Sequence, residues 1–407
     1  MRIGIDATYR LHGGGSLHLR ELLRAWKALG TSECHEIVVF TRQDAAQAIS
    51  SWADDRVKIR PILRNGAGMT GRLLWEQAVL PSVCVKLNLD VLFCPGNIAP
   101  LYSRIPVVVM LQNAAPFCPS ITWRSEGLSR WLKFRCRRVM MSWAARRAAK
   151  CIFISRWFRE VFEQRGYVVP AGNPVIYLGR EKGCGGSGDH ALVKRLRSTR
   201  GILCVSHLYP YKNISALVEA YALQRNVLEP SGLKLYIVGG SVSRREDRRI
   251  KAAIARNRLE GCVELTGPVP QEAVAQLMAN AEFFVFQSTC ENCPSTLIEA
   301  LAAGVPIACS EVGVMPEIAS DAAAFFDPFD PAAIGRALKA LATDADLRAS
   351  LRKKAIARSS EFPTWTEVAQ ATLNVLEEAA TARVKRSGAS THVDSNAITG
   401  NGPPMRV

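Results

Sequence analysis

The chain has 407 residues, too many for one ordinary hydrophobic core, and suits two domains of roughly 150 to 200 residues each. Its 52 basic and 36 acidic residues give a formal net charge of +16, which favours anionic partners such as phosphates, acidic lipids or nucleic acid. No apolar run reaches the roughly 18 residues that a membrane-spanning helix needs, so we expect no transmembrane segment.

The N-terminus and the cysteines indicate a cytoplasmic protein. Residues 1–9 lack the long apolar stretch of a secretion signal and have the pattern of a buried strand. The 12 cysteines lie scattered through apolar segments, which is typical of reduced core thiols rather than of a disulfide framework. Cys290 and Cys293 have the spacing of a metal or redox pair, but no second cysteine pair or histidine cluster with ligand spacing accompanies them. We therefore predict no metal site.

Strand-like apolar runs alternate with helical patterns through the first half of the chain. The expected strands cover 3–6, 35–41, 57–62, 91–94, 107–111, 151–155 and 175–177, and a helix of about 17–29 follows the first of them. Such alternation implies a parallel sheet with helices on both faces. Residues 1–180 are therefore predicted to form an N-terminal α/β domain of the doubly wound, Rossmann-like kind.

A second alternating series follows a glycine-rich segment at 179–188. Its expected strands cover 202–206, 235–239, 263–265, 283–286, 307–309 and 324–326. We assign 181–198 to a linker and 199–360 to a second doubly wound domain. Residues 361–382 are predicted to be helical, and 383–407 turn polar without periodicity, so we expect a disordered tail there.

A candidate site follows the apolar run 281–288, which is expected to contain a buried strand. Glu291 and Glu299 stand eight residues apart, and Pro294, Ser295 and Thr296 between them suit the start of a helix. Free amides and the positive end of the helix dipole attract phosphate, and the flanking carboxylates can accept hydrogen bonds from sugar hydroxyls. The spacing indicates a nucleotide-sugar site; an ordinary N-capped helix with two surface glutamates is the alternative.

Further motifs surround this segment in a fixed order. They are the turn 204–213, the segments 235–240 and 263–268, a small-residue helix ending in Gly304-Val-Pro306, and Pro316-Glu317. Together with the Glu-x7-Glu motif they resemble the donor-binding half of family 4 of the retaining GT-B glycosyltransferases. The resemblance covers the second half of the chain and, more loosely, the first. It implies two Rossmann-like domains that face each other across a cleft, with the helix 361–382 crossing back to the first domain.

The resemblance also implies an activity. Such a protein would be a retaining, metal-independent hexosyltransferase, moving a sugar from a nucleotide-diphosphate sugar to a glycan or lipid-linked acceptor in polysaccharide or lipopolysaccharide biosynthesis. The leaving diphosphate would itself help to deprotonate the acceptor, so no metal or other cofactor is expected. GDP-mannose is the first candidate donor, because the turn 206–213 resembles that of mannosyltransferase members.

Roles for single residues follow from the same resemblance. Glu299 is expected to bind the ribose, Glu291 to face the transferred sugar, and Lys212, just past a strand end, to neutralise the diphosphate. His207 stands where the family often carries an arginine, and a partly charged histidine would neutralise less. Glu291, Lys212 and His207 are thus the catalytic candidates. The other expected donor ligands in this domain are Asn292, Pro294, Ser295, Thr296 and Gly239.

The first domain contributes two candidate segments. Gly13, Gly14 and Gly15 follow the opening strand, where their amides could approach a phosphate or the acceptor closely; a flexible turn is the alternative. They do not form a Gly-x-Gly-x-x-Gly dinucleotide fingerprint. Gln112 and Asn113 stand where family members commonly carry a histidine beside the donor sugar. Their amides can bind sugar hydroxyls but cannot shift protons.

A basic segment covers 124–150, with nine basic residues and the single acidic Glu126. Its apolar residues at helical spacing are Leu132, Cys136, Val139, Met140 and Trp143. This pattern fits a core helix with a solvated rim, or an amphipathic surface that seats the first domain on anionic lipid. We favour the second interpretation, which would make the protein peripheral on the inner face of the cytoplasmic membrane.

Two other function classes remain open. One is a GT-B-type nucleotide-sugar epimerase, although the chain has only six histidines and none in the stretch 291–317 to act as an acid or base. The other is a non-catalytic basic protein that binds polyanions. Nucleic acid is not the expected partner, because no recognisable binding motif accompanies the charge.

Overall fold

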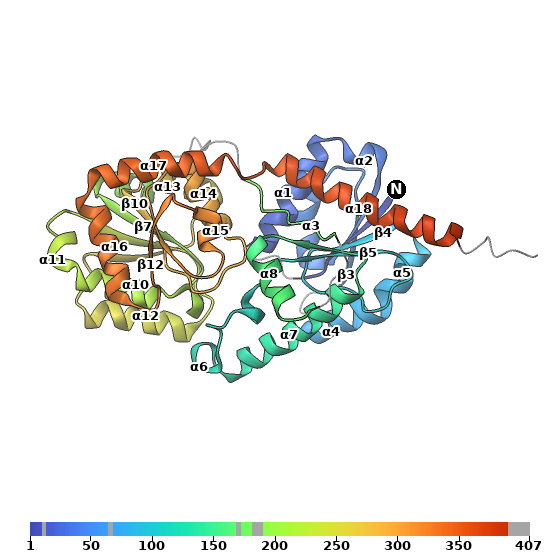
Figure 1. The fold of residues 1–407 in the computed structure, drawn as a ribbon, viewed down its shortest axis with the longest axis horizontal. Coiled ribbons are helices and arrows are strands. Elements are labelled where there is room, and N and C mark those ends of the chain that lie inside the picture. Colours follow the sequence, from blue (N-terminus) through green and yellow to red (C-terminus); the bar gives the residue numbers. More distant parts are fainter. Residues whose placement is uncertain (10–13, 64–67, 168–171, 181–189, 390–407) are drawn as a thin grey trace, which may run out of the picture.

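The computed structural model describes residues 1–9, 14–63, 68–167, 172–180 and 190–389. Figure 1 shows two halves side by side, each built around a six-stranded parallel sheet with helices packed around it. This architecture confirms the predicted fold class of two doubly wound domains. Most of each sheet is buried on both faces, as near-continuous runs such as Val107–Leu111 require.

The first sheet has the strand order β3-β2-β1-β4-β5-β6. Its strands are β1 (Arg2–Ala7), β2 (Glu36–Arg42), β3 (Lys58–Leu63), β4 (Val91–Cys94), β5 (Val107–Leu111) and β6 (Lys150–Phe153). The helices of this half are α1 (Gly14–Ala28), α2 (Thr31–Cys34), α3 (Gln43–Trp52), α4 (Met69–Leu74), the π-helix η1 (Trp75–Val79), α5 (Leu80–Lys86), the 3-10 helix η2 (Ala115–Phe117), α6 (Trp123–Glu126), α7 (Leu128–Arg147) and α8 (Arg156–Gln164). The strand predicted at 175–177 is wrong, because Val175 forms only an isolated bridge with Phe153.

The second sheet has the order β12-β11-β10-β7-β8-β9. Its strands are β7 (Gly201–Val205), β8 (Lys234–Val238), β9 (Val263–Gly267), β10 (Phe283–Phe286), β11 (Ile307–Ser310) and β12 (Ala323–Phe326). The helices are α9 (Ala191–Ser198), the 3-10 helix η3 (Pro210–Lys212), α10 (Ile214–Leu223), α11 (Arg225–Leu228), α12 (Arg244–Arg256), α13 (Gln271–Asn280), α14 (Ser295–Ala303), α15 (Met315–Ala319), α16 (Pro331–Thr343) and α17 (Ala345–Ser359). Read from β9, this order repeats that of the first sheet. In both sheets the strand order reverses, between β1 and β4 in the first and between β7 and β10 in the second.

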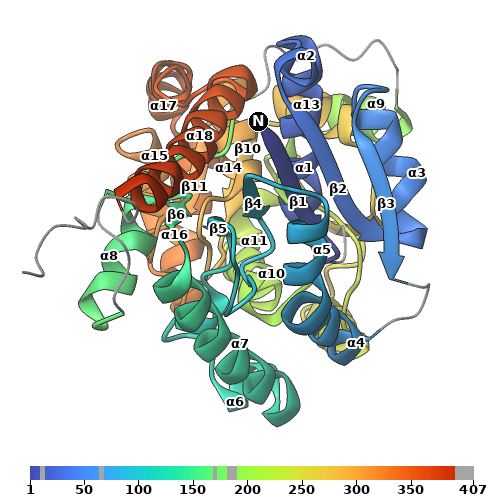
Figure 2. The same cartoon turned by 90° about the vertical axis from the view of Figure 1, so that its right-hand side faces the viewer.

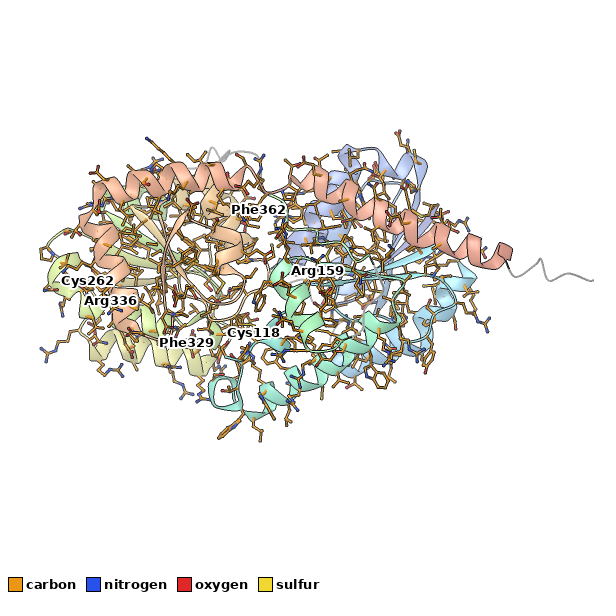
Figure 3. All side chains as sticks on the ribbon, viewed as in Figure 1. Cys118, Arg159, Cys262, Phe329, Arg336 and Phe362 are labelled. Atoms are coloured by element: carbon orange, nitrogen blue, oxygen red, sulfur yellow. A yellow bond between two sulfur atoms is a disulfide. The ribbon has the colours of Figure 1, made fainter. Side chains whose placement is uncertain are left out.

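The last helix, α18 (Trp365–Ala389), returns to the first half and packs against α1, as Figure 1 shows. Phe362 lies where the chain crosses between the halves (Figure 3). The segment that ends the first half is hydrogen-bonded to the segment that leads into α18: the Arg180 amide donates to the Pro363 carbonyl at 2.9 Å. Beyond this point the buried indole of Trp26 donates to the Ala369 carbonyl at 3.1 Å, which ties α1 to α18.

Two predicted boundaries need correction. Residues 190–198 are not a linker, because α9 buries Leu192, Val193 and Leu196 against the second half. Residues 383–389 are not part of a disordered tail, because α18 continues to Ala389. The rest of both predicted segments, 181–189 and 390–407, lies outside the described residues.

Figure 2 looks at the first half from its outer end and shows α6 and the adjoining part of α7 projecting away from the strands, while α7 as a whole packs against β5 and η2. These two helices lie between β5 and β6 in the sequence. Their position matters below, because α6 contacts η3 of the second half.

Candidate active site

Lys212 and Glu291 form an ion pair where the second sheet reverses its strand order. Lys212 ends η3 just after β7, and Glu291 follows β10, the neighbouring strand. The Lys212 Nζ and Glu291 Oε1 atoms lie 2.5 Å apart, and both side chains are mostly buried, with 16% and 12% of their surface exposed. The carboxyl ends of parallel strands at such a reversal are the usual ligand site of open α/β sheets. The structure thus brings together two of the three catalytic candidates.

The turn that carries Lys212 is held on several sides. Gln287 donates from Nε2 to the Lys212 carbonyl at 2.7 Å, and the ammonium lies over the rings of Tyr211 and Phe286 at 5.6 and 5.5 Å. Asn213 ends the turn in the left-handed region at φ 56°. These contacts hold the lysine over the sheet edge.

The start of α14 presents free backbone donors beside this pair. Pro294 is its N-cap and has no side-chain hydrogen bond to the helix, while the amides of Leu297 and Ile298 bond to the Pro294 carbonyl. Among the described residues, the amides of Ser295 and Thr296 have no acceptor. Such unpaired amides at a helix N-terminus are suited to phosphate.

Glu299 lies farther along α14, where its Oε1 accepts a hydrogen bond from Gln271 Nε2 at 3.2 Å. Gln271 is the first residue of α13, which packs beside α14. Glu291 thus precedes α14 and Glu299 lies within it, and their roles on either side of a donor stay predictions.

Gly239 and His207 lie at the adjacent strand ends. Gly239 has φ 149°, and a Cβ atom there would lie 1.9 Å from the Ser206 carbonyl oxygen, so only glycine fits. His207 is exposed and its ring contacts Tyr209 edge to face at 6.4 Å. The backbone conformation and the close Ser206 carbonyl thus explain why position 239 is a glycine. The expected roles of Gly239 and His207 in donor binding stay predictions.

The first-domain candidates meet at the carboxyl edge of the other sheet. Gln112 donates from Nε2 to the Pro95 carbonyl at 3.0 Å, and its Oε1 would lie 4.0 Å from a Cβ on Gly15. The Asn113 side chain accepts from the Ala115 amide at 3.0 Å. Gly14 and Gly15 are the first residues of α1, so the alternative of a flexible turn is wrong for them. Gly13 lies outside the described residues.

The buried side chain of Asn292 joins the two halves. Its Oδ1 accepts from the Ser155 hydroxyl at 2.7 Å, and its Nδ2 donates to the Leu111 carbonyl at 3.0 Å. Both partners stand at the carboxyl ends of first-sheet strands. The amide is therefore engaged in contacts between the halves, and its expected role as a donor ligand stays a prediction.

Glu317 makes a second connection that the sequence did not reveal. Its carboxylate accepts from the amides of Arg156 and Trp157 at 2.8 and 2.6 Å, and from the Tyr177 hydroxyl at 2.6 Å. A side chain of the second half thus satisfies the first free amides of α8 in the first half. The only sequence signal was the Pro-Glu motif, which does not identify its partner.

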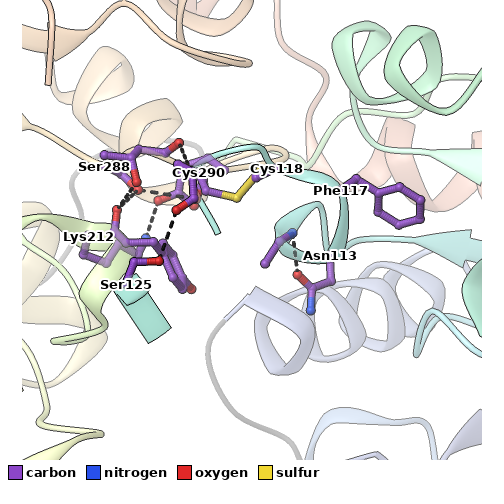
Figure 4. The surroundings of a disulfide bond; sticks show 12 residues. Asn113, Phe117, Cys118, Ser125, Lys212, Ser288 and Cys290 are labelled. Atoms are coloured by element: carbon purple, nitrogen blue, oxygen red, sulfur yellow. Dashed lines mark hydrogen bonds and ion pairs between the residues drawn. A yellow bond between two sulfur atoms is a disulfide. The ribbon is translucent and has the colours of Figure 1, made fainter. Parts of the chain in front are cut away.

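A disulfide also crosses between the halves. Cys118 follows η2 and Cys290 precedes Glu291, and their sulfur atoms are bonded across a sequence separation of 172 residues. Figure 4 shows the bond, with Lys212 and Ser288 on one side of it and Asn113 and Phe117 on the other. The expectation that the cysteines are reduced core thiols is wrong for this pair. Cys293 is a buried thiol whose pKa is raised by burial to about 12.

The helix α7 exposes an apolar stripe. The exposed fractions of Leu132, Val139 and Trp143 are 48%, 54% and 59%. The residues that α7 buries are instead Phe134, Met141, Ala144 and Ala145. The interpretation of the predicted stripe as a core face is therefore wrong for these three side chains.

Two family models match the chain one after the other. The model described as Glycosyltransferase Family 4 matches residues 12–179, and the one described as Glycosyl transferases group 1 matches residues 195–358. This chain belongs to glycosyltransferase family 4.

Curated relatives of this family 4 chain include two bacterial transferases. The O-antigen chain mannosyltransferase B of Escherichia coli is 28% identical over 172 residues, which cover 42% of this chain and 44% of the relative. The D-inositol 3-phosphate glycosyltransferase of Streptomyces avermitilis is 31% identical over 191 residues, covering 45% and 41%. The chain thus spans less than half the length of these relatives.

Solved structures share the fold of this family 4 protein over nearly its whole length. Anabaena HepE, solved with UDP and glucose, has a TM-score of 0.71 and 20% identity, covering 93% of this chain and 100% of HepE. WaaG, a glycosyltransferase involved in lipopolysaccharide biosynthesis, has a TM-score of 0.70 and 15% identity, covering 92% and 99%. At these identities the likeness shows the GT-B fold.

The described parts of this family 4 chain lack two further features. They contain no helix that is long and apolar enough to cross a membrane. Nor do they group three or more histidine, cysteine or acidic side chains in a way that could hold a metal ion.

The disulfide gives a direct chemical prediction. We expect thiol titration of the denatured protein to find two more thiols after reduction than before it, because Cys118 and Cys290 are bonded. The double variant Cys118→Ser, Cys290→Ser should show no such difference. Equal thiol counts for the parent before and after reduction would show that the pair is not oxidised.

Proposed function

We propose that the protein transfers a hexose from a nucleotide-diphosphate sugar to a glycan or lipid-linked acceptor, with retention of configuration and without a metal ion. The observation that carries this proposal is the Lys212–Glu291 pair beside the free amides of Ser295 and Thr296. Positive charge and unpaired donors converge there at one sheet edge, which suits a diphosphate. Nucleotide-sugar binding has further support in the structure of Anabaena HepE with UDP-glucose.

The chemistry needs little beyond positioning and charge. The bond between the sugar carbon and the diphosphate oxygen breaks, the acceptor oxygen bonds to that carbon from the same face, and its proton passes to the departing diphosphate. Lys212 and the α14 amides would stabilise the negative charge that develops on this leaving group. His207 would stand nearby on the adjoining turn.

The two glutamates would orient the donor. Glu299 would accept hydrogen bonds from the ribose, and Glu291 from the hydroxyls of the transferred sugar. Glu291 also holds Lys212 in place, since the two are paired. Gln112 and Asn113 would contact the sugar from the first half, because Leu111, directly before them, bonds to Asn292 beside Glu291.

GDP-mannose is the donor that we propose. The turn 206–213 resembles that of mannosyltransferases, and the O-antigen chain mannosyltransferase B and the serotype-specific mannosyltransferase WbdA of Escherichia coli are among the relatives. A role in polysaccharide or lipopolysaccharide assembly is proposed on the same grounds.

We further propose that α7 seats the protein on the inner face of the cytoplasmic membrane. The exposed stripe of Leu132, Val139 and Trp143 is flanked by the exposed cations Arg135 and Arg146. A helix that presents apolar and basic side chains together fits an anionic lipid surface. Such a position would bring a membrane-held acceptor close to the first half.

Nucleotide binding tests the donor pocket. We expect Lys212→Ala and Glu299→Ala each to weaken GDP or UDP binding by about tenfold or more, since each removes a charged contact with the nucleotide. Calorimetric titration measures this. The exposed residues Lys234 and Glu260, changed to alanine, serve as charge-matched controls. Parent-like affinity in both site variants would place the nucleotide elsewhere.

Chelation tests the proposed role of Lys212 and the α14 amides. We expect donor hydrolysis or sugar transfer to continue in excess EDTA, because these groups and not a cation would meet the charge of the leaving diphosphate. Product formation from GDP-mannose would be followed with and without chelator. Activity that stops in EDTA and returns with magnesium or manganese would contradict the proposal.

Vesicle binding tests the membrane face. A variant with Leu132, Val139 and Trp143 changed to serine and Arg135 and Arg146 to glutamine should partition at least about tenfold less onto anionic vesicles, while keeping its nucleotide affinity. Each of the two removed cations alone contributes about 1 kcal/mol to the binding free energy at an anionic lipid surface.

The control for this experiment changes exposed apolar residues of the second half. Leu223, Phe329 and Ile356 are exposed by 57%, 62% and 53%, so their serine variants remove a comparable apolar surface away from α7. Vesicle sedimentation of all three proteins at low and high salt measures the difference. Equal binding of the α7 variant and the parent would reject the membrane face.

A further inference from the structure

Besides the candidate donor site at Lys212 and α14, the structure has a cleft between α6 and α7 of the first half and α12 of the second, called the second cleft below. Its volume is about 780 Å³. The residues that line it are Ser125, Glu126, Ser129, Arg130, Lys133, Pro210, Val242, Ser243, Arg245, Glu246, Arg248 and Arg249. The lining comes from both halves, so the cleft exists only because they pack together.

The charge of this cleft is mainly positive. Five of its lining residues are basic and two are acidic. Arg130 pairs with Glu126 at 2.9 Å. Within the described part of the chain, Lys133, Arg245, Arg248 and Arg249 have no carboxylate within ion-pair distance. Most of the cations are therefore available to an anionic ligand.

The two carboxylates form one ion pair with these cations, the one between Glu126 and Arg130. Glu126 and Glu246 are buried, with 9% and 4% of their surfaces exposed. Burial raises the pKa of both carboxyls, opposed by Arg130 for Glu126 and by Arg249 for Glu246. Arg249 and Arg245 interact electrostatically with Glu246, but no carboxylate oxygen lies within ion-pair distance of the three arginines at the start of α12.

The second cleft adjoins the donor site. Pro210 lines it and Lys212 ends the same short helix, η3. The Arg130 guanidinium lies over the Tyr209 ring at 4.7 Å, and that ring stacks on Tyr211 at 5.4 Å, beside Lys212. A ligand held in this cleft would therefore lie next to the sugar donor.

We propose that the second cleft binds a phosphate or diphosphate ester, as carried by a lipid-linked acceptor. Three arginines and a lysine that lie outside ion-pair distance of the described carboxylates, with the hydroxyls of Ser129 and Ser243, match the charge and acceptor oxygens of such a group. Binding of the anion depends only on this cleft, whereas its identity as the acceptor rests on the proposed function. The donor diphosphate would occupy the separate site at Lys212 and α14.

The test compares two variants that lose the same charge. The cleft variant changes Arg245, Arg248 and Arg249 to glutamine. The control changes Lys234, Lys339 and Lys353 to glutamine, three exposed residues on other elements that pair with no carboxylate in the described structure. Inorganic pyrophosphate and farnesyl diphosphate are titrated into the full chain with excess GDP or UDP present, so that the donor site is filled.

We expect both diphosphates to bind the parent and the control saturably. The cleft variant should bind them about tenfold more weakly or worse, because charged hydrogen bonds are lost. No saturable binding, or an equal loss in both variants, would overturn the proposal. So would dependence on the three arginines that appears only with phosphatidylglycerol vesicles, because the ligand would then be a lipid headgroup.

Nucleotide affinity, measured on the same proteins, separates this inference from the proposed function. The cleft variant should bind GDP or UDP like the parent, because Lys212 and Glu299 are intact. Loss of nucleotide binding in the cleft variant would show that the two sites are one and would overturn the inference. Failure of the Lys212→Ala experiment instead concerns the donor pocket alone.

Discussion

The hydrogen bonds of the buried Asn292 amide tie the two halves of the protein together beside the candidate site. A buried amide without partners costs free energy, and here Ser155 and the Leu111 carbonyl satisfy it from the opposite half. Glu317 adds charged hydrogen bonds to the start of α8, and the Cys118–Cys290 bond adds a covalent link. The carboxyl ends of both sheets therefore face one seam, and the loops that carry ligand-binding groups converge there.

This seam brings charged side chains together. Lys212 and Glu291 are mostly buried, so their attraction is screened less than that of a surface pair. The second cleft places cations of α12 opposite Arg130 and Lys133 of α7. Part of the net charge of +16 is thus concentrated along the seam, where phosphate groups would enter.

The alternation of apolar runs with helical patterns was enough to predict both sheets, because strands buried on both faces need apolar residues nearly throughout. The family resemblance placed Lys212 and Glu291 in one pocket, and the structure pairs them because the loops after β7 and β10, two neighbouring parallel strands, meet at one edge of the sheet. Helix α9 was missed because a short helix beside a glycine-rich segment resembles a linker.

Contacts between distant residues were decided only by the tertiary structure. Cys118 and Cys290 are 172 residues apart, and no spacing rule pairs them once both lie on loops. Helical periodicity identified the apolar stripe of α7 but could not say whether it faces the core or the solvent. The sequence by itself determined most of the strands and which loops follow them, because those depend on local pattern. Only the packing of the two halves decided which side chains of those loops meet, because those contacts depend on where each sheet lies.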